Sequence, residues 1–396
     1  MTQQLQQSPD IANAQHRDIA EWHEANPKRS HGEMLAIAAQ RSGLSPLHLG
    51  RDFMRHSNSG RGIQITDYLN HQLWDMDLHP DGAADLFVGA TTNWPICHTV
   101  NSKNWWAAAE DKVMMQTMLT ANGIPMPETL AVVDTYSARR YPDITRIEDH
   151  NELRDLVLSH PPASLFAKTL DGMVGNGAVV IEAADDTHVT FTGFDAMTWE
   201  HVMHTVFGNS RYLIQKRLEN HPSIAPFCSG IASVRLPAFI EGQDILAPLA
   251  ALKMPWGGNV TCAYWRKDNL ACGIDPDTGR ITRVAAHDGP FTNGLRDHPE
   301  TPGLVGLQLP DWDKVRSLHE AAARVFADIP YQSTDIALTP KGPVLIELNY
   351  AGSFNILQNA TGKGLLQPPI KRFFERHGVP WTPGKRRGLL GMFGGR

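Results

Sequence analysis

Two acidic residues near the carboxyl end of the chain stand where a β-hairpin would bring them together. Residues 334–349 form two apolar stretches on either side of a Pro-Lys-Gly sequence, which favours a turn. A turn centred on Lys341 makes Asp335 and Glu347 cross-strand partners, roughly 5 Å apart at Cβ. Asn349 lies two residues beyond Glu347 and therefore projects from the same face of the predicted sheet.

Three oxygen-bearing side chains on one sheet face suit a hard divalent cation. Mg2+ prefers oxygen ligands and usually keeps water or substrate phosphates in its remaining positions. Without a cation the two carboxylates would repel, and one would take up a proton. The pattern predicts a Mg2+ site at Asp335, Glu347 and Asn349. The alternative is a pair of solvated surface acids, which the apolar neighbours on both sides disfavour.

A second segment, 166–180, has residue types that bind phosphate. Lys168 lies at the end of a predicted strand, and a glycine-rich turn follows with Gly172, Gly175 and Gly177. Glycines let backbone N–H groups approach phosphate oxygens, and a lysine neutralises part of the phosphate charge. The turn is not a Walker A loop, because Gly-Lys-Ser/Thr is missing and no helix follows at once. An ordinary β-turn is the alternative interpretation.

The elements that must position these residues change in character along the chain. The first ~105 residues predict short helices that are interrupted at glycine- and proline-containing sequences. From residue 111 onwards the pattern is mixed, which predicts an α+β core with antiparallel hairpins. The predicted helices are 111–122, 196–207, 312–328 and 366–376, and the predicted strands are 129–133, 164–170, 178–182, 212–218, 231–240, 245–253, 281–285, 334–339 and 344–349.

Composition and charge exclude several classes of protein. A chain of 396 residues can form two or three structural units. Its 42% apolar and 20% charged residues are typical of a soluble globular protein. The net charge of −6 argues against duplex nucleic acid as a partner. No apolar run approaches 18 residues, so no transmembrane helix is predicted.

The cysteines and the two ends of the chain indicate a cytoplasmic protein. Cys97, Cys228, Cys262 and Cys272 lack the spacing of a metal site and are interpreted as reduced thiols. The polar first ten residues do not form a signal peptide. The tail 384–396 mixes three adjacent cations with large apolar residues, which would permit a weak contact with an anionic membrane surface. A frayed terminus is the alternative interpretation.

The hairpin and the glycine-rich turn together resemble the ATP-grasp superfamily. Further segments resemble its sugar-transfer-associated branch, which is found with cell-surface polysaccharide biosynthesis. The similarity covers roughly residues 93–367. The segments that carry it are Ala109-Glu110-Asp111-Lys112, the Gly-Ile-Pro-Met-Pro sequence at 123–127, His298-Pro299, Leu309-Pro310-Asp311-Trp312, Glu347-Leu348-Asn349 and Asn355-Ile356-Leu357-Gln358.

This resemblance implies a fold in which two α+β lobes clasp ATP, preceded by a helical region. The implied units are a mainly helical region at 1–105, an N-terminal lobe with the glycine-rich lid at 106–215, a C-terminal catalytic lobe at 216–380 and a flexible basic tail at 381–396. The family pattern also contains an Asp-Asn pair followed by two glycines. Here Asp268-Asn269-Leu270-Ala271 departs from that pattern, so an acceptor-site role for Asn269 is in doubt.

The resemblance also implies the roles of individual residues. Lys112 and Lys168 would hold the nucleotide phosphates, and Arg235 would steady the transferring γ-phosphate, with Lys168 and Arg235 as the catalytic residues. Lys253 and Arg266 are further candidates for a phosphate or carboxylate clamp. The remaining implied nucleotide contacts are the lid glycines Gly172, Gly175 and Gly177 and the adenine- and ribose-binding residues Gln215, Lys216, Arg217 and Glu219. Asp335, Glu347 and Asn349 carry over as Mg2+ ligands.

The function implied by the resemblance is an ADP-forming ligase. ATP with Mg2+ or Mn2+ would activate a small-molecule or glycan carboxylate as an acyl phosphate, and an amine or similar nucleophile would then displace phosphate. The setting would be surface polysaccharide or secondary-metabolite biosynthesis, and a homodimer would be compatible with it. The alternatives are a phosphotransferase of the same fold and a non-catalytic ATP-binding regulatory module.

Overall fold

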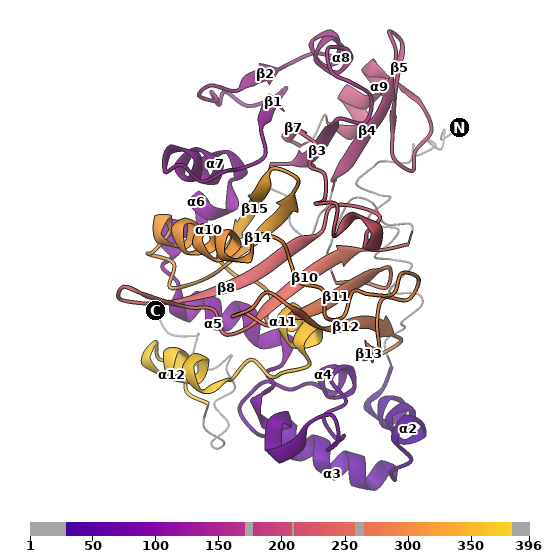
Figure 1. The fold of residues 1–396 in the computed structure, drawn as a ribbon, viewed down its shortest axis with the longest axis vertical. Helices are drawn as coiled ribbons and strands as arrows, with labels where there is room; N and C mark the ends of the chain where they lie inside the picture. Colours follow the sequence, from indigo (N-terminus) through magenta and orange to yellow (C-terminus); the bar gives the residue numbers. More distant parts are fainter. Residues whose placement is uncertain (1–28, 171–176, 208–209, 258–264, 382–396) are drawn as a thin grey trace, which may run out of the picture.

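Two β-sheets with helices around them make up the protein (Figure 1). The computed structural model describes residues 29–170, 177–207, 210–257 and 265–381. In the view of Figure 1, sheet A lies at the upper end, sheet B in the middle and the first helices of the chain at the lower end. Gly172, Gly175, Cys262 and the tail from residue 382 lie outside the described residues.

Sheet A contains seven strands within the described residues, in the order β2-β1-β7-β3-β4-β5-β6. Its neighbouring strands run antiparallel except β1 and β2, which are parallel. One face packs on α8 (His150–Leu158), α9 (Trp199–His201) and the π-helix η4 (Val202–Val206) in a single apolar core. The strands are β1 (Thr129–Val133), β2 (Thr145–Ile147), β3 (Leu165–Thr169), β4 (Val179–Ala184), β5 (His188–Phe191), β6 (Met197–Thr198) and β7 (Tyr212–Lys216).

Sheet B is antiparallel and, in the described part of the chain, has eight strands in the order β13-β12-β11-β10-β8-β14-β15, with β9 beside β8. All nine residues of β14 are buried, as expected for a central strand that is covered on both faces. The strands are β8 (Ser233–Glu241), β9 (Asp244–Leu246), β10 (Ala250–Pro255), β11 (Asn269–Ile274), β12 (Ile281–Asp288), β13 (Phe291–Leu295), β14 (Tyr331–Thr339) and β15 (Gly342–Asn349).

Two layers of helices cover sheet B. Val234, Leu252 and Ile336 point to one face, where they share an apolar core with α6, α7 and α10. Ala251 and Phe239 point to the other face, where α5, α11 and α12 pack. The helices are α5 (Asn93–Val100), α6 (Trp106–Glu110), α7 (Lys112–Ala121), α10 (Trp312–Val325), α11 (Phe354–Thr361) and α12 (Pro368–Arg376), with short 3-10 turns at η3 (Lys103–Trp105) and η5 (Ala225–Phe227).

The first helices of the chain form a small unit against β13. Ser30 and Ser45 cap the first two of them by accepting hydrogen bonds from backbone N–H groups, which satisfies donors that a helix leaves free at its start. Phe291 of β13 packs into the apolar core of the unit. Its elements are α2 (His31–Ser42), α3 (Pro46–Ser57), α4 (Ile65–Asn70), η1 (Pro80–Leu86) and η2 (Ala90–Thr92).

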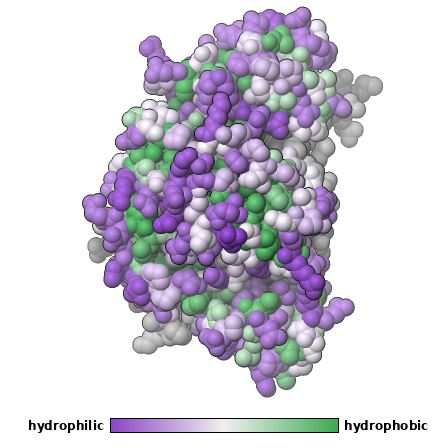
Figure 2. All heavy atoms as spheres, viewed as in Figure 1, coloured by the Kyte–Doolittle hydropathy of each residue, from purple (hydrophilic) through white to green (hydrophobic). Residues whose placement is uncertain are grey.

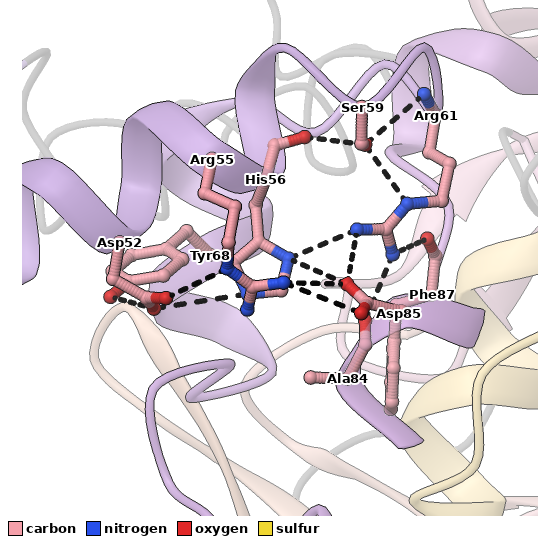
Figure 3. Close-up of polar contacts among 9 residues, drawn as sticks. All are labelled: Asp52, Arg55, His56, Ser59, Arg61, Tyr68, Ala84, Asp85 and Phe87. Carbon is pink, nitrogen blue, oxygen red and sulfur yellow. Dashed lines mark hydrogen bonds and ion pairs between the residues drawn. The ribbon is translucent and has the colours of Figure 1, made fainter. Parts of the chain in front are cut away.

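A buried arginine network connects α3 to η1 in this unit (Figure 3). Arg61 is 5% exposed, and each guanidinium nitrogen donates: Nε to Ser59, Nη1 to the backbone carbonyls of Ala84 and Phe87, and Nη2 to Asp85. Burying a charge is costly unless every donor is matched. Here the matching groups come from two segments, so the network holds them together.

Some predicted elements differ from the structure. The strand predicted at 245–253 is two strands, β9 and β10. Strand β9 pairs with residues 239–241 of β8, and β10 pairs with residues 233–235 of β8. The helix predicted at 196–207 begins with the two residues of β6 and continues as α9 and η4. Strands β2, β5, β11 and β13 were not predicted, since pairing with the strands next to them in the sequence stabilises them more than their own residue types do.

The molecular surface is mixed in polarity. Figure 2 shows hydrophilic side chains over most of one face, with apolar groups scattered among them. Among the described residues, no helix combines the length and the hydropathy that crossing a bilayer requires. The boundaries predicted for the four units remain a prediction; sheet A occupies 129–216 and sheet B 233–349.

Candidate functional site

The predicted hairpin is present, and its cross-strand pair is Asp335 with Glu347. The turn itself differs from the prediction. Thr339 pairs with Gly342, so the turn is centred between Pro340 and Lys341 and not on Lys341. One extra residue on β15, Ile346, forms a β-bulge between the pairs and restores the predicted register. Asp335 and Glu347 are therefore paired as predicted, because the shifted turn and the bulge at Ile346 offset each other.

The carboxylate of Asp335 is 4% exposed and is held by two cations from neighbouring strands. Arg235 of β8 donates from Nε to Oδ1 at 2.8 Å and from Nη2 to Oδ2 at 2.6 Å. Lys253 of β10 donates from Nζ to Oδ2 at 2.8 Å. Burial opposes ionisation, but the charges of Arg235 and Lys253 outweigh it and hold the pKa of Asp335 at about 2.

Glu347 and Asn349 complete the group of oxygen-bearing side chains. The Nδ2 group of Asn349 lies 3.5 Å from Oδ2 of Asp335, so the two side chains share a face as predicted. Within the described chain, the Glu347 carboxylate has neither a hydrogen-bond partner nor an ion-pair partner. Its negative charge favours the protonated form of Lys168, which places these two groups near each other across the two sheets.

Lys168 belongs to β3 of sheet A and lies near Glu347 of the hairpin. Burial and the charge of Lys112 lower the pKa of Lys168 to about 8, against the opposing effect of Glu347. No acceptor for its Nζ group is found in the described part of the chain. Lys112, at the start of α7, donates from Nζ to the carbonyl of Leu170 at 3.1 Å. Both predicted lysines therefore lie at the end of β3, where the glycine-rich segment begins.

A cavity of about 490 Å³ adjoins this group of charges. Its volume is in the range of small-molecule sites. Lys168 and Ile346 lie in its wall, so the cavity reaches the hairpin directly next to Glu347. Apolar side chains dominate one part of the wall: Phe166, Val180, Leu218 and Ile231. The predicted nucleotide-binding residues that line the cavity are Lys168, Gln215, Lys216, Arg217 and Glu219.

The backbone of the predicted adenine-binding segment is partly used already. The N–H group of Lys216 donates to Glu128, and that of Arg217 donates to Ser164. These N–H groups are therefore committed to sheet A. The next N–H group, that of Leu218, has no acceptor among the described residues and belongs to the cavity wall. Leu218, which the sequence interpretation left out, is thus the better placed donor for a bound ring.

The side chains of this segment lie on two sides of it. Gln215 is buried and donates from Nε2 to the hydroxyl of Thr129 at 2.8 Å. Lys216 is exposed and pairs with Glu128, with Nζ 2.6 Å from Oε2. Glu219 is exposed at the cavity rim. A ligand in the cavity would therefore meet carboxylate, amide and ammonium groups along one edge.

Of the predicted lid glycines, Gly177 is the one within the described residues. It has a φ of 71°, and a Cβ built there would lie 2.5 Å from the hydroxyl oxygen of Tyr212. Only glycine fits this position without displacement of the tyrosine ring. The backbone at Gly177 therefore lies close to Tyr212 of β7 and Thr169 of β3.

The donor set fits a hard divalent cation in its chemistry. Asp335 is ionised, Glu347 is its cross-strand partner, and the side-chain amide of Asn349 lies beside it. In the described chain no group of three or more His, Cys, Asp or Glu side chains could hold a metal ion, so an amide and ligand oxygens would complete the coordination here. Arg235 and Lys253 would have to release Asp335 in part.

Lys253 is the main residue that the sequence interpretation underestimated. It had been ranked as a secondary candidate, whereas the structure places its ammonium group on Asp335. The signal was weak because Lys253 reaches Asp335 through β8, and pairing of β10 with β8 and of β8 with β14 is not visible in the sequence. Asn269 is the first residue of β11, and its N–H group donates to the carbonyl of Arg266, which precedes the strand.

The comparisons with known proteins identify a family. The model of sugar-transfer-associated ATP-grasp proteins matches residues 93–372. No curated protein sequence matches the chain. The matched range contains both sheets and the whole group of charged residues described above, and it begins at the first residue of α5.

Several solved structures are similar in fold. The ATP-grasp ligase PsnB complexed with a minimal precursor is 12% identical, with 70% of this chain and 64% of that chain covered and a TM-score of 0.36. Biotin carboxylase from Campylobacter jejuni is 10% identical, with coverage of 74% and 50% and a TM-score of 0.42. D-alanyl-alanine synthetase A from Vibrio cholerae is 12% identical, with coverage of 68% and 66% and a TM-score of 0.38. The match thus spans less than two thirds of the first two proteins.

Proposed function

The chain belongs to the sugar-transfer-associated ATP-grasp family, and on this premise we propose that it is an ATP-dependent ligase that joins a carboxylate to an amine or a similar nucleophile. The products would be ADP, phosphate and the amide. The carboxylate would belong to a small molecule or a glycan, in the synthesis of a surface polysaccharide or a secondary metabolite. ATP and Mg2+, or Mn2+ in its place, would be required.

The observation that carries this proposal is the position of the cavity relative to the charges. The cavity has apolar side chains in its wall, and Lys168 and Ile346 in that wall join it to the cluster of Arg235, Lys253, Asp335 and Glu347. An apolar slot suits a nucleobase, and an excess of positive charge suits phosphates. The apolar wall and the neighbouring charges together favour a nucleotide with its phosphates towards the hairpin.

In the proposed first step, a substrate carboxylate oxygen forms a bond to the γ-phosphorus of ATP, and the bond to the ADP oxygen breaks. Negative charge spreads over the phosphoryl oxygens, so catalysis depends on positioned cations. Lys168 has a free ammonium group there, and Arg235 has a free Nη1 group, since within the described residues only Nε and Nη2 bind Asp335. Mg2+, when bound, would neutralise phosphate charge and orient the phosphates.

In the second step, the amine nitrogen attacks the acyl carbon, the bond from carbon to the phosphate oxygen breaks, and phosphate leaves. The amine must lose a proton during this step, which the departing phosphate can accept. The main task of the chain is then to exclude water from the acyl phosphate. No nucleophilic side chain is needed, because the substrate carboxylate is the nucleophile in the first step and the amine is the nucleophile in the second.

The test is the stoichiometry of ATP consumption. Purified protein with Mg2+ is expected to release ADP and phosphate when a carboxylate and an amine are both supplied from substrate pools, and a new amide should appear in the mass spectrum. Inactivity of the Glu347→Gln variant in the same assay would assign the turnover to this site. Formation of AMP and pyrophosphate would contradict the proposal.

Two outcomes would favour the alternatives. Phosphate transfer to a hydroxyl without any requirement for an amine would identify a phosphotransferase of the same fold. Tight binding of ATP with no turnover against any acceptor pool would identify a regulatory binding module. The ligase is favoured because Asp335, Glu347 and Asn349 all lie together on the hairpin, whereas a module that only binds ATP could lose one of these ligands.

A further inference from the structure

The ladder between β14 and β15 ends just beyond the predicted metal ligands. Its last pair is Ser333 with Asn349. In a regular ladder, Tyr331 and Ala351 would form the next hydrogen-bonded positions along the two strands. Instead the chain turns after Asn349 and enters α11 at Phe354. Tyr331 and the turn would therefore keep unpaired backbone groups in a buried region unless another element supplied partners.

Helix α5 supplies these partners through the side chain of Asn101. Its Oδ1 atom accepts from the N–H group of Tyr331 at 2.9 Å, and its Nδ2 group donates to the carbonyl of Tyr331 at 2.7 Å. The same Nδ2 group donates to the carbonyl of Tyr350 at 2.6 Å. The amide thus takes the place of a strand residue opposite Tyr331 and ties it to the residue that directly follows Asn349.

A second asparagine at the other end of α5 holds the rest of the turn. Asn93 donates from Nδ2 to the carbonyl of Ala351 at 3.0 Å and accepts from the N–H group of Phe354 at 3.1 Å. Both asparagines are buried, with 8% of Asn93 and 4% of Asn101 exposed. An amide has both donors and an acceptor, which a carboxylate or a hydroxyl cannot match in this arrangement.

The edge position of β15 makes this arrangement important for the site. Strand β15 lies at the edge of sheet B, so β14 is its one strand partner in the described sheet. Glu347 and Asn349 both lie on this strand, and its far end is fixed by contacts to α5. A shift of the turn by a fraction of an ångström would move Asn349 relative to Asp335.

We propose that Asn93 and Asn101 are positioning residues for the metal-binding hairpin, and that α5 therefore belongs to the catalytic unit although it precedes both sheets in the sequence. The proposal rests on the proposed function in so far as that hairpin binds Mg2+. It assigns a task to part of the helical N-terminal region. Neither asparagine contacts the cavity, so both act through β14 and β15.

The experiment compares two identical changes three residues apart. Asn101→Asp keeps the acceptor for Tyr331 but replaces the Nδ2 donor with an oxygen that faces two carbonyls. Asn104→Asp makes the same change at an exposed position and serves as the control. Binding of ATP is measured twice for each protein, with Mn2+ and with EDTA. Asn93→Ala is a second variant in case Asn101→Asp does not yield folded protein.

We expect Mn2+-dependent ATP affinity to fall about tenfold or more in Asn101→Asp, as is usual when the groups that orient metal ligands are removed. Binding in EDTA should change less than twofold, because the cavity is not altered. The Asn104→Asp protein should behave like the unchanged chain in both conditions. A general loss of structure would instead weaken both kinds of binding equally, and that result would overturn the proposal.

Hydrogen exchange separates this proposal from the proposed function. Amides of 331–335 and 345–350 should exchange faster in Asn101→Asp and in Asn93→Ala than in the unchanged chain, whether or not a nucleotide binds. Unchanged exchange in both variants would refute the role of α5. If the unchanged chain bound no ATP with Mn2+, the proposed function would fail, and the exchange measurement would still decide whether α5 holds the hairpin.

Discussion

Two clusters of opposite charges in the described part of the chain each hold a largely buried arginine, and they differ in how completely their donors are used. In the helical unit, every nitrogen of the Arg61 guanidinium has an acceptor (Figure 3). At the hairpin, Arg235 donates from two of its three nitrogens to Asp335, while Lys168 and Glu347 have no hydrogen-bond or ion-pair partner among the described residues. In both clusters an arginine binds an aspartate, but only the hairpin cluster has charged groups without a partner among the described residues.

This difference separates stability from binding. The Arg61 network has no guanidinium nitrogen left to donate to a ligand, and its effect is to stabilise the fold by joining two segments. An unsaturated cluster next to a cavity stores unfavourable electrostatic energy that a ligand of suitable charge can relieve. The following predictions test this division, because each cluster should respond mainly in one of the two properties.

Removal of one charge at the hairpin should have the largest effect, and it should be an effect on turnover. We expect Glu347→Gln to lower kcat/KM for ATP about 100- to 1,000-fold, since the carboxylate orients charge at the transferring phosphoryl group. The melting temperature should change little, because Glu347 has no partner to lose within the described chain. Glu320→Gln on the exposed side of α10 is the control. Turnover within tenfold of the unchanged chain would contradict the assignment.

The reverse outcome is expected in the helical unit. Arg61→Met should lower the free energy of unfolding by about 2–3 kcal/mol, because it leaves buried carbonyls of Ala84 and Phe87 without donors. Activity per folded molecule should be unchanged. Urea denaturation of this variant and of Arg51→Met, an exposed position on α3, measures the difference. A large loss of activity without loss of stability would mean that the saturated cluster also serves the site.

The two cations on Asp335 can be separated by a metal titration. Lys253→Met should raise the affinity for Mn2+ in the absence of nucleotide about tenfold, because a cation beside a carboxylate disfavours a second cation there. The same variant should turn over more slowly, since it lacks a charge for the phosphates. Electron paramagnetic resonance of free Mn2+ measures the binding, with Lys314→Met as the control. Weaker binding in Lys253→Met would show that Asp335 is not a metal ligand.

The smallest expected effect concerns pH and the histidine inside the saturated cluster. Burial and the charges of Arg55 and Arg61 lower the pKa of His56 to about 4, and Asp52 and Asp85 oppose this only in part. A histidine with a lowered pKa in the folded state stabilises the fold above its unfolded pKa of about 6.5, and this stabilisation is lost as the pH falls towards 4.

Between pH 7.5 and 5.5 the contribution of His56 should therefore fall by about 1 kcal/mol. Comparison with His56→Gln isolates it, because the other buried histidines contribute equally to both proteins. The slope of unfolding free energy against pH should be smaller in His56→Gln. Equal slopes in the two proteins would mean that His56 is not neutral and buried in the folded state.

The sequence predicted the pairing of Asp335 with Glu347 better than the elements around it, for a physical reason. Asp335, Glu347 and Asn349 lie on one local hairpin, and a hairpin register follows from nearby residues. The cavity residues Gln215 to Glu219 also form one continuous segment. Such local patterns can be found without knowledge of the tertiary structure.

Contacts between distant segments could not be predicted in the same way. Lys253 reaches Asp335 across β8, and Asn101 reaches Tyr331 and Tyr350 over more than 200 residues of sequence. A lone lysine or asparagine carries no signal of its partner. The strand predicted at 245–253 also merged two strands, because its apolar run conceals the break between β9 and β10.

The bulge at Ile346 has a consequence for how the length of this hairpin can vary. Ile346 is the extra residue between the pairs Ile336–Leu345 and Asp335–Glu347, so deletion of Ile346 would leave a regular ladder with Glu347 still opposite Asp335. As the bulged residue, Ile346 forms part of the cavity wall, while its neighbour Glu347 faces Asp335. Deletion of Ile346 should therefore keep the two carboxylates paired while it removes a residue of the cavity wall, whereas one residue inserted between Gly342 and Leu345 should turn Glu347 and Asn349 towards α6 and α10.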